Sequence, residues 1–222
     1  MTAAVFVPSR RSFVAGAASL AALSLTGCAT SRRIDILQPR FSDYYLTMYG
    51  PLPDERFPVP AIDLTKLDPS MFRTQVPDPT GERPGTIVVN TSERHLYLVQ
   101  EGGQAIRYGV GIGREGFAWN GKAAVGRKAE WPTWTPPPEM QVRQPETREW
   151  ANGMPGGLTN PLGARAMYIY QGGRDTLYRL HGTLEVWSIG SAVSSGCVRL
   201  LFHDIIDLYG RCPVGTPIVV NS

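Results

Sequence analysis

The chain has 222 residues, which is enough for one domain of ordinary size with extensions. Its formal net charge is +3, and it falls to +1 when Arg10 and Arg11 leave with a cleaved leader, so the charge balance argues against nucleic acid as a partner. The 19 prolines and 24 glycines favour a turn-rich β architecture over a helical bundle.

Residues 1–27 are predicted to be an export signal. Two arginines at positions 10 and 11 precede an apolar run over 14–25, about half the length that a membrane-spanning helix needs. The arginine pair, followed by Ser12 and Phe13, resembles a twin-arginine signal. We therefore expect the mature chain to be exported to the periplasm.

The leader ends in Leu-Thr-Gly-Cys at residues 25–28, which resembles a bacterial lipobox. In such proteins the peptidase cuts before the cysteine, so Cys28 would carry the lipid and anchor the chain to a membrane, with the outer membrane favoured. The alternative is a general signal that is cleaved near Ala29 and leaves Cys28 without a role.

Residues 28–83 are predicted to form a proline-rich arm without a long periodic run. Aromatic side chains such as Tyr44, Tyr45 and Tyr49 could fold part of this arm onto the following domain. A fully solvated arm would instead be a flexible tether with an r.m.s. span of about 40 Å. The sequence favours neither alternative.

A single domain over 84–221 is predicted to be mainly β, with one or two short helices and a long loop insertion. Apolar and β-branched runs between turn residues predict strands over 86–90, 95–100, 105–112, 123–128, 165–170, 176–180 and 216–220. Residues 139–162 are polar and interrupted by glycine and proline, which is typical of a lid or a substrate-binding loop. A short helix is expected over 204–209.

His181 and Cys197 are the candidate catalytic pair. The strand over 176–180 brings His181 to its end, and Cys197 follows glycine in a turn that can present a thiol. A free cysteine has a pKa near ~8.5, so few thiols ionise at neutral pH until a neighbour takes the proton. Imidazole is the side chain best suited to accept that proton.

Three segments around this pair, 180–183, 187–190 and 193–200, resemble the L,D-transpeptidase catalytic domain, often called the YkuD domain. The resemblance extends over about 84–221 and implies a β-sandwich of the YkuD type. One departure is notable: many members have a histidine where this chain has Ser195.

The resemblance implies an enzyme of the bacterial cell wall. Cys197 would attack the carbonyl of the third residue of a peptidoglycan tetrapeptide stem, release D-alanine and form a thioester. His181 would take the thiol proton and then protonate the leaving amine. The carbonyl of Gly182 would orient the imidazole. Oxyanion stabilisation and substrate binding would fall to a further set of residues: Ser194, Ser195, Gly196 and Arg199.

The acceptor of the acyl group stays open at this stage. An amine of diaminopimelate on a second stem would give a 3→3 cross-link, water would give an L,D-carboxypeptidase, and an amine of an outer-membrane protein would attach that protein to the wall. A non-catalytic wall-binding module would result if Cys197 were tied to Cys212 in a disulfide. No cofactor is expected, and the spacing of the histidines and cysteines does not predict a metal site.

Several residues also have structural explanations. His203 is a second candidate base, but its place at the start of a helix favours a structural role. Arg199 could pair with Asp204 or Asp207 instead of with substrate. Three tryptophans could line a peptide groove or pack inside the domain: Trp131, Trp134 and Trp187.

Overall fold

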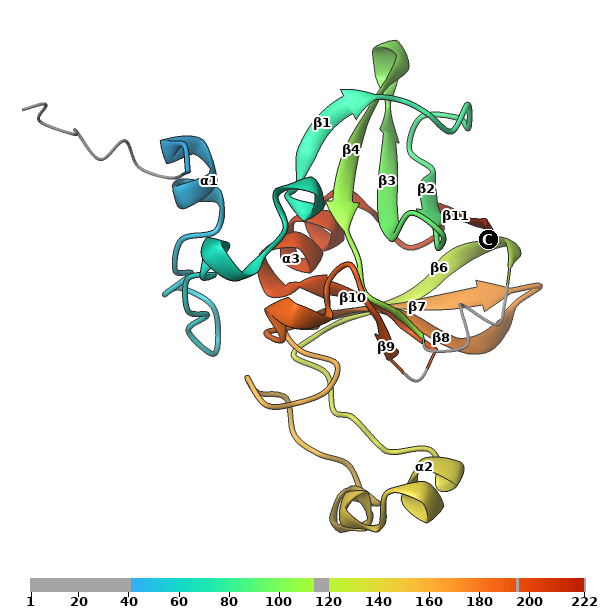
Figure 1. The fold of residues 1–222 in the computed structure, drawn as a ribbon. Helices are drawn as coiled ribbons and strands as arrows, with labels where there is room; N and C mark the ends of the chain where they lie inside the picture. The colour runs from blue at the N-terminus through green and yellow to red at the C-terminus, as the bar shows by residue number, and fades with distance from the viewer. Residues whose placement is uncertain (1–40, 114–119, 195, 222) are drawn as a thin grey trace, which may run out of the picture. The chain divides into compact units, whose positions relative to one another are not determined.

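The computed structural model describes residues 41–113, 120–194 and 196–221, which belong to one compact unit (Figure 1). The predicted leader, Cys28 and Ser195 lie outside the described residues, and so does the side chain of Ser194. In the ranges that are described, no helix is both long enough and apolar enough to cross a membrane.

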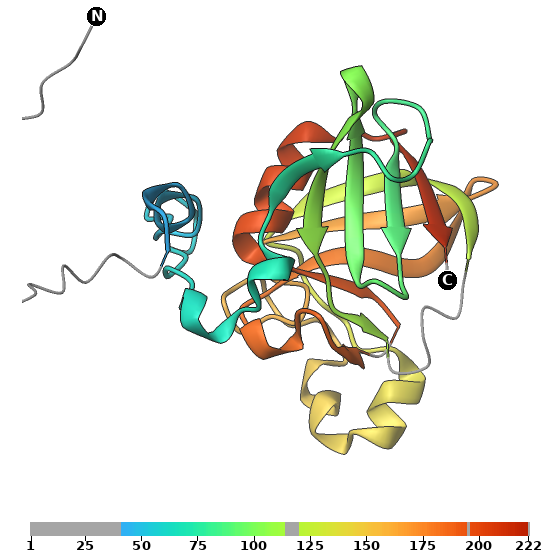
Figure 2. The same ribbon diagram turned by 45° about the horizontal axis from the view of Figure 1, so that its top comes forward.

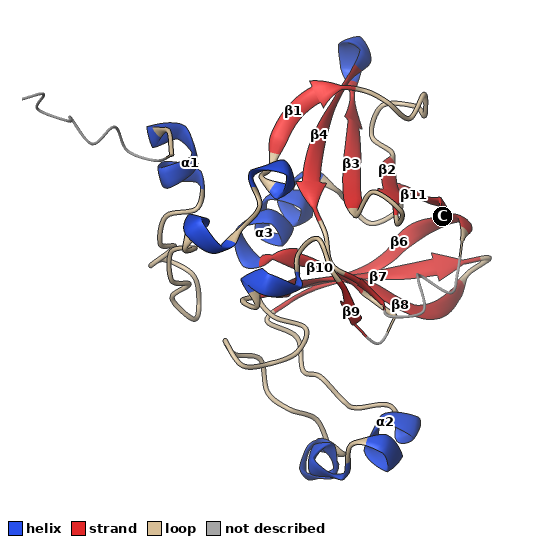
Figure 3. Cartoon of the chain, in the orientation of Figure 1, coloured by secondary structure: helices blue, strands red, loops and turns tan. Residues whose placement is uncertain are grey.

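Strands are the main regular structure of the described chain (Figure 3). Nine strands of the described chain form one sheet in the order β1-β4-β3-β2-β11-β6-β7-β8-β10, and β5 pairs with β9 beside it. The strands are β1 (Thr74–Pro77), β2 (Ile87–Asn90), β3 (His95–Gln100), β4 (Gln104–Gly109), β5 (Ile112–Gly113), β6 (Gly121–Glu130), β7 (Arg165–Gln171), β8 (Arg174–Thr183), β9 (Ala192–Ser194), β10 (Val198–Leu201) and β11 (Pro217–Asn221). The prediction of a mainly β fold is confirmed.

Every strand expected from the sequence is present, but the predicted strand over 105–112 is divided into β4 and β5. The chain leaves β4 and crosses to the edge of β10, where Gly111 exchanges two backbone hydrogen bonds with Arg199. A Cβ atom at Gly111 would lie 2.4 Å from the carbonyl oxygen of Ser188, so only glycine fits this crossing.

Three α-helices accompany the sheet in the described residues: α1 (Asp43–Met48), α2 (Pro138–Arg143) and α3 (Phe202–Arg211). Short 3-10 helices are η1 (Leu64–Lys66), η2 (Pro69–Met71), η3 (Glu101–Gly103), η4 (Pro145–Trp150) and η5 (Val186–Ser188). Helix α3 is longer than the predicted 204–209. It contacts β7 and β8 and buries one apolar face, which includes Ile205 and Leu208.

The main hydrophobic core draws on both halves of the sheet. Side chains from β2, β3 and β4 pack with those from β7, β8 and β10, and α3 adds Ile205 and Leu208. Alternation explains the pattern, because every second residue of a strand points to the same face. The site described below lies on the last strands of this sheet, β8 and β10.

The described part of the predicted arm packs against the domain. Strand β1 pairs with β4 at one edge of the sheet, which Figure 2 shows. Phe72 is only 3% exposed, and its ring contacts three other rings, those of Phe41, Tyr45 and Tyr49. Strand β1 was not predicted, because four residues that end in a proline give too short a pattern, although an edge strand tolerates that proline.

A long excursion between β6 and β7 carries α2 and η4 away from the sheet (Figure 1). Its two sides meet where Trp134 and Met154 exchange backbone hydrogen bonds. The side-chain amide of Asn160 closes the base of the excursion by donating to three backbone carbonyls, those of Pro132, Met154 and Pro155. The excursion therefore has a fixed base rather than an unstructured one.

Candidate active site

Two neighbouring parallel strands bring the candidate pair to one place. Arg199 of β10 pairs with His181 of β8, and Val198 pairs with Leu180. Cys197 precedes β10 by one residue, so it lies beside Arg179. Because alternate residues of a strand share a face, His181, Arg179, Cys197 and Arg199 lie on the same side of the sheet. Segments that are separated by fifteen residues in the sequence thus meet through strand pairing.

His181 is 6% exposed, and its Nδ1 atom lies 3.1 Å from the carbonyl oxygen of Gly182. A carbonyl only accepts hydrogen bonds, so Nδ1 is the donor and the lone pair of the neutral ring is on Nε2. The carbonyl of Pro161 is a second backbone acceptor beside the ring. The imidazole therefore has the tautomer that a general base requires, with its basic nitrogen turned away from Gly182.

The positive charges around the pair act differently on its two members. Burial lowers the pKa of His181 to about 4, and the charge of Arg199 is the second cause. Cys197 is partly exposed as a residue, but burial of its thiol raises its pKa above the usual value. A backbone hydrogen bond from Arg179 and the charges of Arg179 and Arg199 lower the pKa of this thiol in part. At neutral pH the pair therefore rests as a neutral thiol and a neutral imidazole.

Gly196 gives the backbone before Cys197 a conformation that other residues rarely adopt. Its φ angle is 127°, in the region that favours glycine. A Cβ atom there would lie 3.5 Å from the ring of Tyr178, which is an ordinary contact. Backbone geometry, rather than space, is thus what requires glycine at this position.

Arg199 pairs with an acid that sequence analysis did not consider. Its Nη1 atom donates to Glu185 Oε2 at 2.7 Å. The alternative partners Asp204 and Asp207 instead face Arg73 of the arm, at 3.7 Å and 3.2 Å. The alternative in which Arg199 pairs with either aspartate is therefore wrong, because α3 turns both carboxylates towards Arg73 of the arm.

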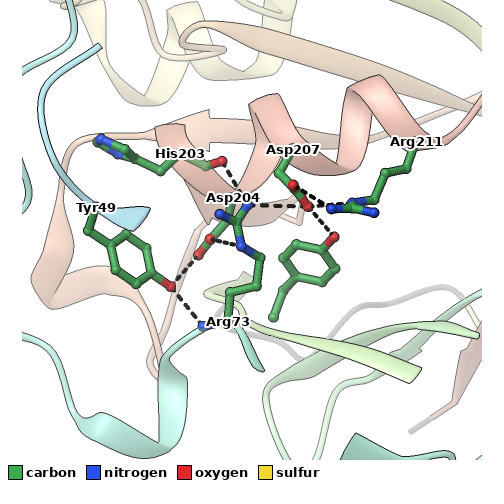
Figure 4. Close-up of polar contacts among 7 residues, drawn as sticks. Tyr49, Arg73, His203, Asp204, Asp207 and Arg211 are labelled. Atoms are coloured by element: carbon green, nitrogen blue, oxygen red, sulfur yellow. Dashed lines mark hydrogen bonds and ion pairs between the residues drawn. The ribbon is translucent and has the colours of Figure 1, made fainter. Parts of the chain in front are cut away.

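The second candidate base, His203, belongs to that same cluster on α3 (Figure 4). It is buried, and its Nε2 atom lies 2.6 Å from the carbonyl oxygen of Gly50 in the arm. Tyr49 accepts a hydrogen bond from the backbone N–H of Arg73 at 2.7 Å and donates to Asp204 at 3.4 Å. His203 thus contacts the docked arm and lies among structural residues.

The tryptophans divide between packing and exposure. Trp131 is buried against Phe57 and Phe202, and its indole N–H donates to Glu55 Oε2 at 3.0 Å. Trp187 of η5, in contrast, is 63% exposed on the segment between His181 and Cys197. Of these two, only Trp187 is available to a peptide substrate.

Cys197 and Cys212 are separate thiols rather than a disulfide. Cys212 ends α3 and is 1% exposed within the main core. Burial raises its pKa to about 11. Cys212 is therefore an inert packing residue, and nothing in the described fold ties up the thiol of Cys197 in a bond to it.

Sequence reasoning missed two residues of this region. Arg179 lies beside Cys197 and was not singled out, because only the strand pairing shows that they are neighbours. Asn160 holds the loop that brings Pro161 to His181, and its Oδ1 atom accepts from the backbone N–H of Leu162 at 2.9 Å. Asn160 stands in a segment rich in glycine and proline, but nothing in that sequence indicates that its side-chain amide holds the loop.

Comparison with known proteins agrees with this geometry. The family model for the L,D-transpeptidase catalytic domain, YkuD, matches residues 84–220. This chain belongs to the YkuD family. The match begins ten residues after the start of β1, so the family domain leaves out a strand that the structure pairs with β4.

Curated relatives of this YkuD protein carry the same family name. "Probable L,D-transpeptidase ErfK/SrfK" of Escherichia coli K12 is 38% identical over 138 residues, which are 60% of this chain and 43% of that protein. "Probable L,D-transpeptidase YbiS" of the same strain is 40% identical over 136 residues, 59% of this chain and 42% of that protein. The match thus spans less than half the length of these relatives.

A solved structure from Brucella melitensis is 45% identical to this YkuD protein and covers 72% of this chain and 99% of its own, with a TM-score of 0.49. It is named "Probable carnitine operon oxidoreductase caia", a name that applies to that protein alone.

Proposed function

We propose that this YkuD protein is a peptidoglycan L,D-transpeptidase in which Cys197 is the nucleophile and His181 the general base and acid. The observation that supports this most is the pairing of β10 with β8, which puts Cys197 and His181 on one face of two adjacent strands. Family membership supplies the reaction class, because YkuD enzymes are cysteine-dependent acyltransferases that act on peptide stems of the wall.

In the first half-reaction, the sulfur of Cys197 bonds to the carbonyl carbon of the third stem residue. The thiol proton passes to Nε2 of His181, and the bond from that carbon to the nitrogen of D-alanine breaks. His181 then gives the proton to the leaving amine. A pKa of about 4 makes His181 a weak base but a strong acid, so it suits the second proton transfer particularly well.

Backbone amides near Gly196 and Cys197 are the proposed donors to the oxyanion, together with that of Ser195. The φ angle of Gly196 supports this role, because glycine takes this conformation readily and lets the main chain approach a ligand closely. Ser194 ends β9 in front of this turn, and we place it with Arg199 in the substrate-binding surface.

In the second half-reaction, an acceptor amine bonds to the thioester carbon and the carbon–sulfur bond breaks. The proton of the amine returns to the sulfur through His181. We propose the amine of diaminopimelate on a second stem as acceptor, which gives a 3→3 cross-link. Water as acceptor gives an L,D-carboxypeptidase, and an amine of an outer-membrane protein gives attachment of that protein to the wall.

We further propose that the chain acts in the periplasm and is tethered through a lipid on Cys28. The support is the lipobox-like segment 25–28 after an arginine pair. Metabolic labelling of cells with a palmitate analogue tests it. The expected result is label on the wild-type chain and none on Cys28→Ser. Equal label on both chains, or label on neither, would refute the anchor.

The test of the enzymatic proposal is a muropeptide analysis. Purified residues 29–222 are incubated with disaccharide tetrapeptides, and the products are separated and weighed by mass spectrometry. Released D-alanine with 3→3 dimers indicates transfer, whereas tripeptides alone indicate the carboxypeptidase. No release of D-alanine by a folded protein whose Cys197 reacts with iodoacetamide would overturn the proposal.

A further inference from the structure

A row of side chains crosses three strands of the sheet and ends beside the nucleophile, which precedes the fourth. Arg127 of β6 lies opposite Tyr168 of β7, and Tyr168 lies opposite Arg179 of β8. Arg179 in turn lies beside Cys197, as the pairing of β10 with β8 requires. Residues that lie directly opposite one another in a sheet share a face, so the row runs along the surface that carries Cys197.

Contacts within the row confirm this shared face. The guanidinium carbon of Arg127 lies 3.4 Å from the centroid of the Tyr168 ring, and that of Arg179 lies 4.3 Å from it. The ring is 5% exposed because both arginines cover it. Stacking on an aromatic ring holds a guanidinium in a defined plane but leaves its N–H groups available at the edge.

The three arginines near the site differ in how their charge is balanced. Arg179 is paired with both oxygens of Asp175, at 2.7 Å and 2.9 Å, and Arg199 is paired with Glu185. Arg127 is exposed, and among the described residues no carboxylate lies within ion-pair distance of it. The charge of Arg127 is felt by Asp175, but both oxygens of that carboxylate already accept hydrogen bonds from Arg179. Arg127 therefore supplies the unbalanced positive charge of this surface.

The spacing of the strands gives the reach of that charge. Neighbouring strands are about 4.8 Å apart, so the ring of Tyr168 lies two strands, about 10 Å, from Cys197, and the Arg127 guanidinium on its far side lies about 13 Å from the nucleophile. A donor stem has two carboxylates several bonds from the attacked carbonyl, and an extended stem directs either of them towards a guanidinium at that distance. One ends the diaminopimelate side chain of the third residue, and the other belongs to the preceding glutamate.

We infer that Arg127, held flat on Tyr168, binds a carboxylate of the donor stem and makes this enzyme specific for donors that carry it. Planar guanidinium and carboxylate groups form two parallel hydrogen bonds, which neither an amide nor an amine reproduces. The inference rests on the proposed function and adds a specificity-determining residue to it.

The test compares wild type with Arg127→Gln on three donor tetrapeptides: one with both carboxylates, one amidated on diaminopimelate and one amidated on glutamate. Release of D-alanine gives kcat and KM. We expect Arg127→Gln to lower kcat/KM about tenfold on the donor with both carboxylates, mainly through KM. On one of the amidated donors, kcat/KM of wild type should be about tenfold lower than on the donor with both carboxylates, and Arg127→Gln should lower it no further. The group that is amidated in that donor is the carboxylate that Arg127 binds.

Lys122→Gln is the matched control, since it removes one charge from an exposed position of the same strand. Its kcat/KM is expected to equal that of wild type on all three donors. Thermal unfolding of both variants checks that stability is unchanged, and Arg127→Lys should recover only part of the loss because it keeps the charge without the planar fork.

The two proposals fail in different ways. The role of Arg127 is overturned if wild type uses all three donors equally, or if Arg127→Gln discriminates between the donors as strongly as wild type. Either result leaves the enzymatic function standing. Absence of D-alanine release by wild type from every donor overturns the proposed function, and the specificity inference falls with it.

Discussion

His181 and Arg199 occupy paired positions on two adjacent parallel strands, and after burial the charge of Arg199 is the largest cause that lowers the pKa of His181. The same charge favours the ionised form of the Cys197 thiol. The cation of Arg199 thus opposes a resting imidazolium and, in the proposed reaction, would support a developing anion on sulfur or on the attacked carbonyl. We therefore expect the proposed pair to ionise when substrate is bound rather than before.

This arrangement predicts an unusual pH profile. With a pKa of about 4, His181 is neutral throughout the range in which an ordinary histidine titrates, so kcat/KM for D-alanine release should be level from about pH 5.5 to pH 8. Arg199→Gln should raise the pKa of His181 and shift the acid limb upward, whatever it does to substrate binding. An acid limb near pH 6.5 in wild type would contradict this assignment.

Thiol reactivity should separate the two described cysteines. Cys197 is expected to give one mass adduct with iodoacetamide or a carbapenem, while Cys212, which is 1% exposed with its pKa raised to about 11, gives none. Cys197→Ala should lower turnover at least about a thousandfold with an unchanged unfolding temperature. Cys212→Ala serves as the control and should keep both the adduct and the activity.

Two aspartates on α3 should respond to pH with opposite signs. Burial raises the pKa of Asp204 from 3.8 to about 7, despite Arg73 nearby. Its stabilising contribution is complete below pH 3.8 and is lost as the pH rises through 7. Because asparagine cannot ionise, the free energy of unfolding of Asp204→Asn relative to that of wild type should rise as the pH goes from 4 to 8. The rise should be on the order of 4 kcal/mol.

Asp207 provides the comparison for that experiment. Burial alone would raise its pKa, but hydrogen bonds from Arg211 and Tyr108 hold the pKa below the usual value. A lowered pKa contributes stability that is present at neutral pH and lost as the pH falls, so Asp207→Asn should destabilise the protein at pH 8. Chemical denaturation of both variants at pH 5 and pH 8 measures the two effects, and equal signs at pH 8 would refute the prediction.

The docked arm should be needed for stability. Phe72 is 3% exposed in an aromatic cluster, so Phe72→Ala should lower the free energy of unfolding by about 3–5 kcal/mol. Tyr44→Ala is the control, because Tyr44 is 62% exposed and should cost little. A fragment that starts at residue 84 also loses β1 and should not fold, which circular dichroism would show. A cooperative, wild-type-like transition in that fragment would contradict a structural role of the arm.

Much of the fold could be predicted from local patterns. The strand over 95–100, the strand that leads to His181 and the amphipathic helix over 204–209 follow from alternation and from helical spacing within the segment itself. The candidate pair, Cys197 and His181, was named for its chemistry and its flanking residues. These inferences needed no knowledge of which segments are neighbours in space.

Partners that are distant in the sequence were decided by the tertiary structure alone. Arg199 meets Glu185 rather than an aspartate of α3, Arg179 lies beside Cys197, and Arg127 stacks on Tyr168. The order in which the strands pair and the turn after β8 set these contacts, and the pattern within one strand does not show which distant strand will be its neighbour. The sequence by itself therefore determined several of the strands and the candidate reactive residues, while only the pairing of the strands decided which charges surround them.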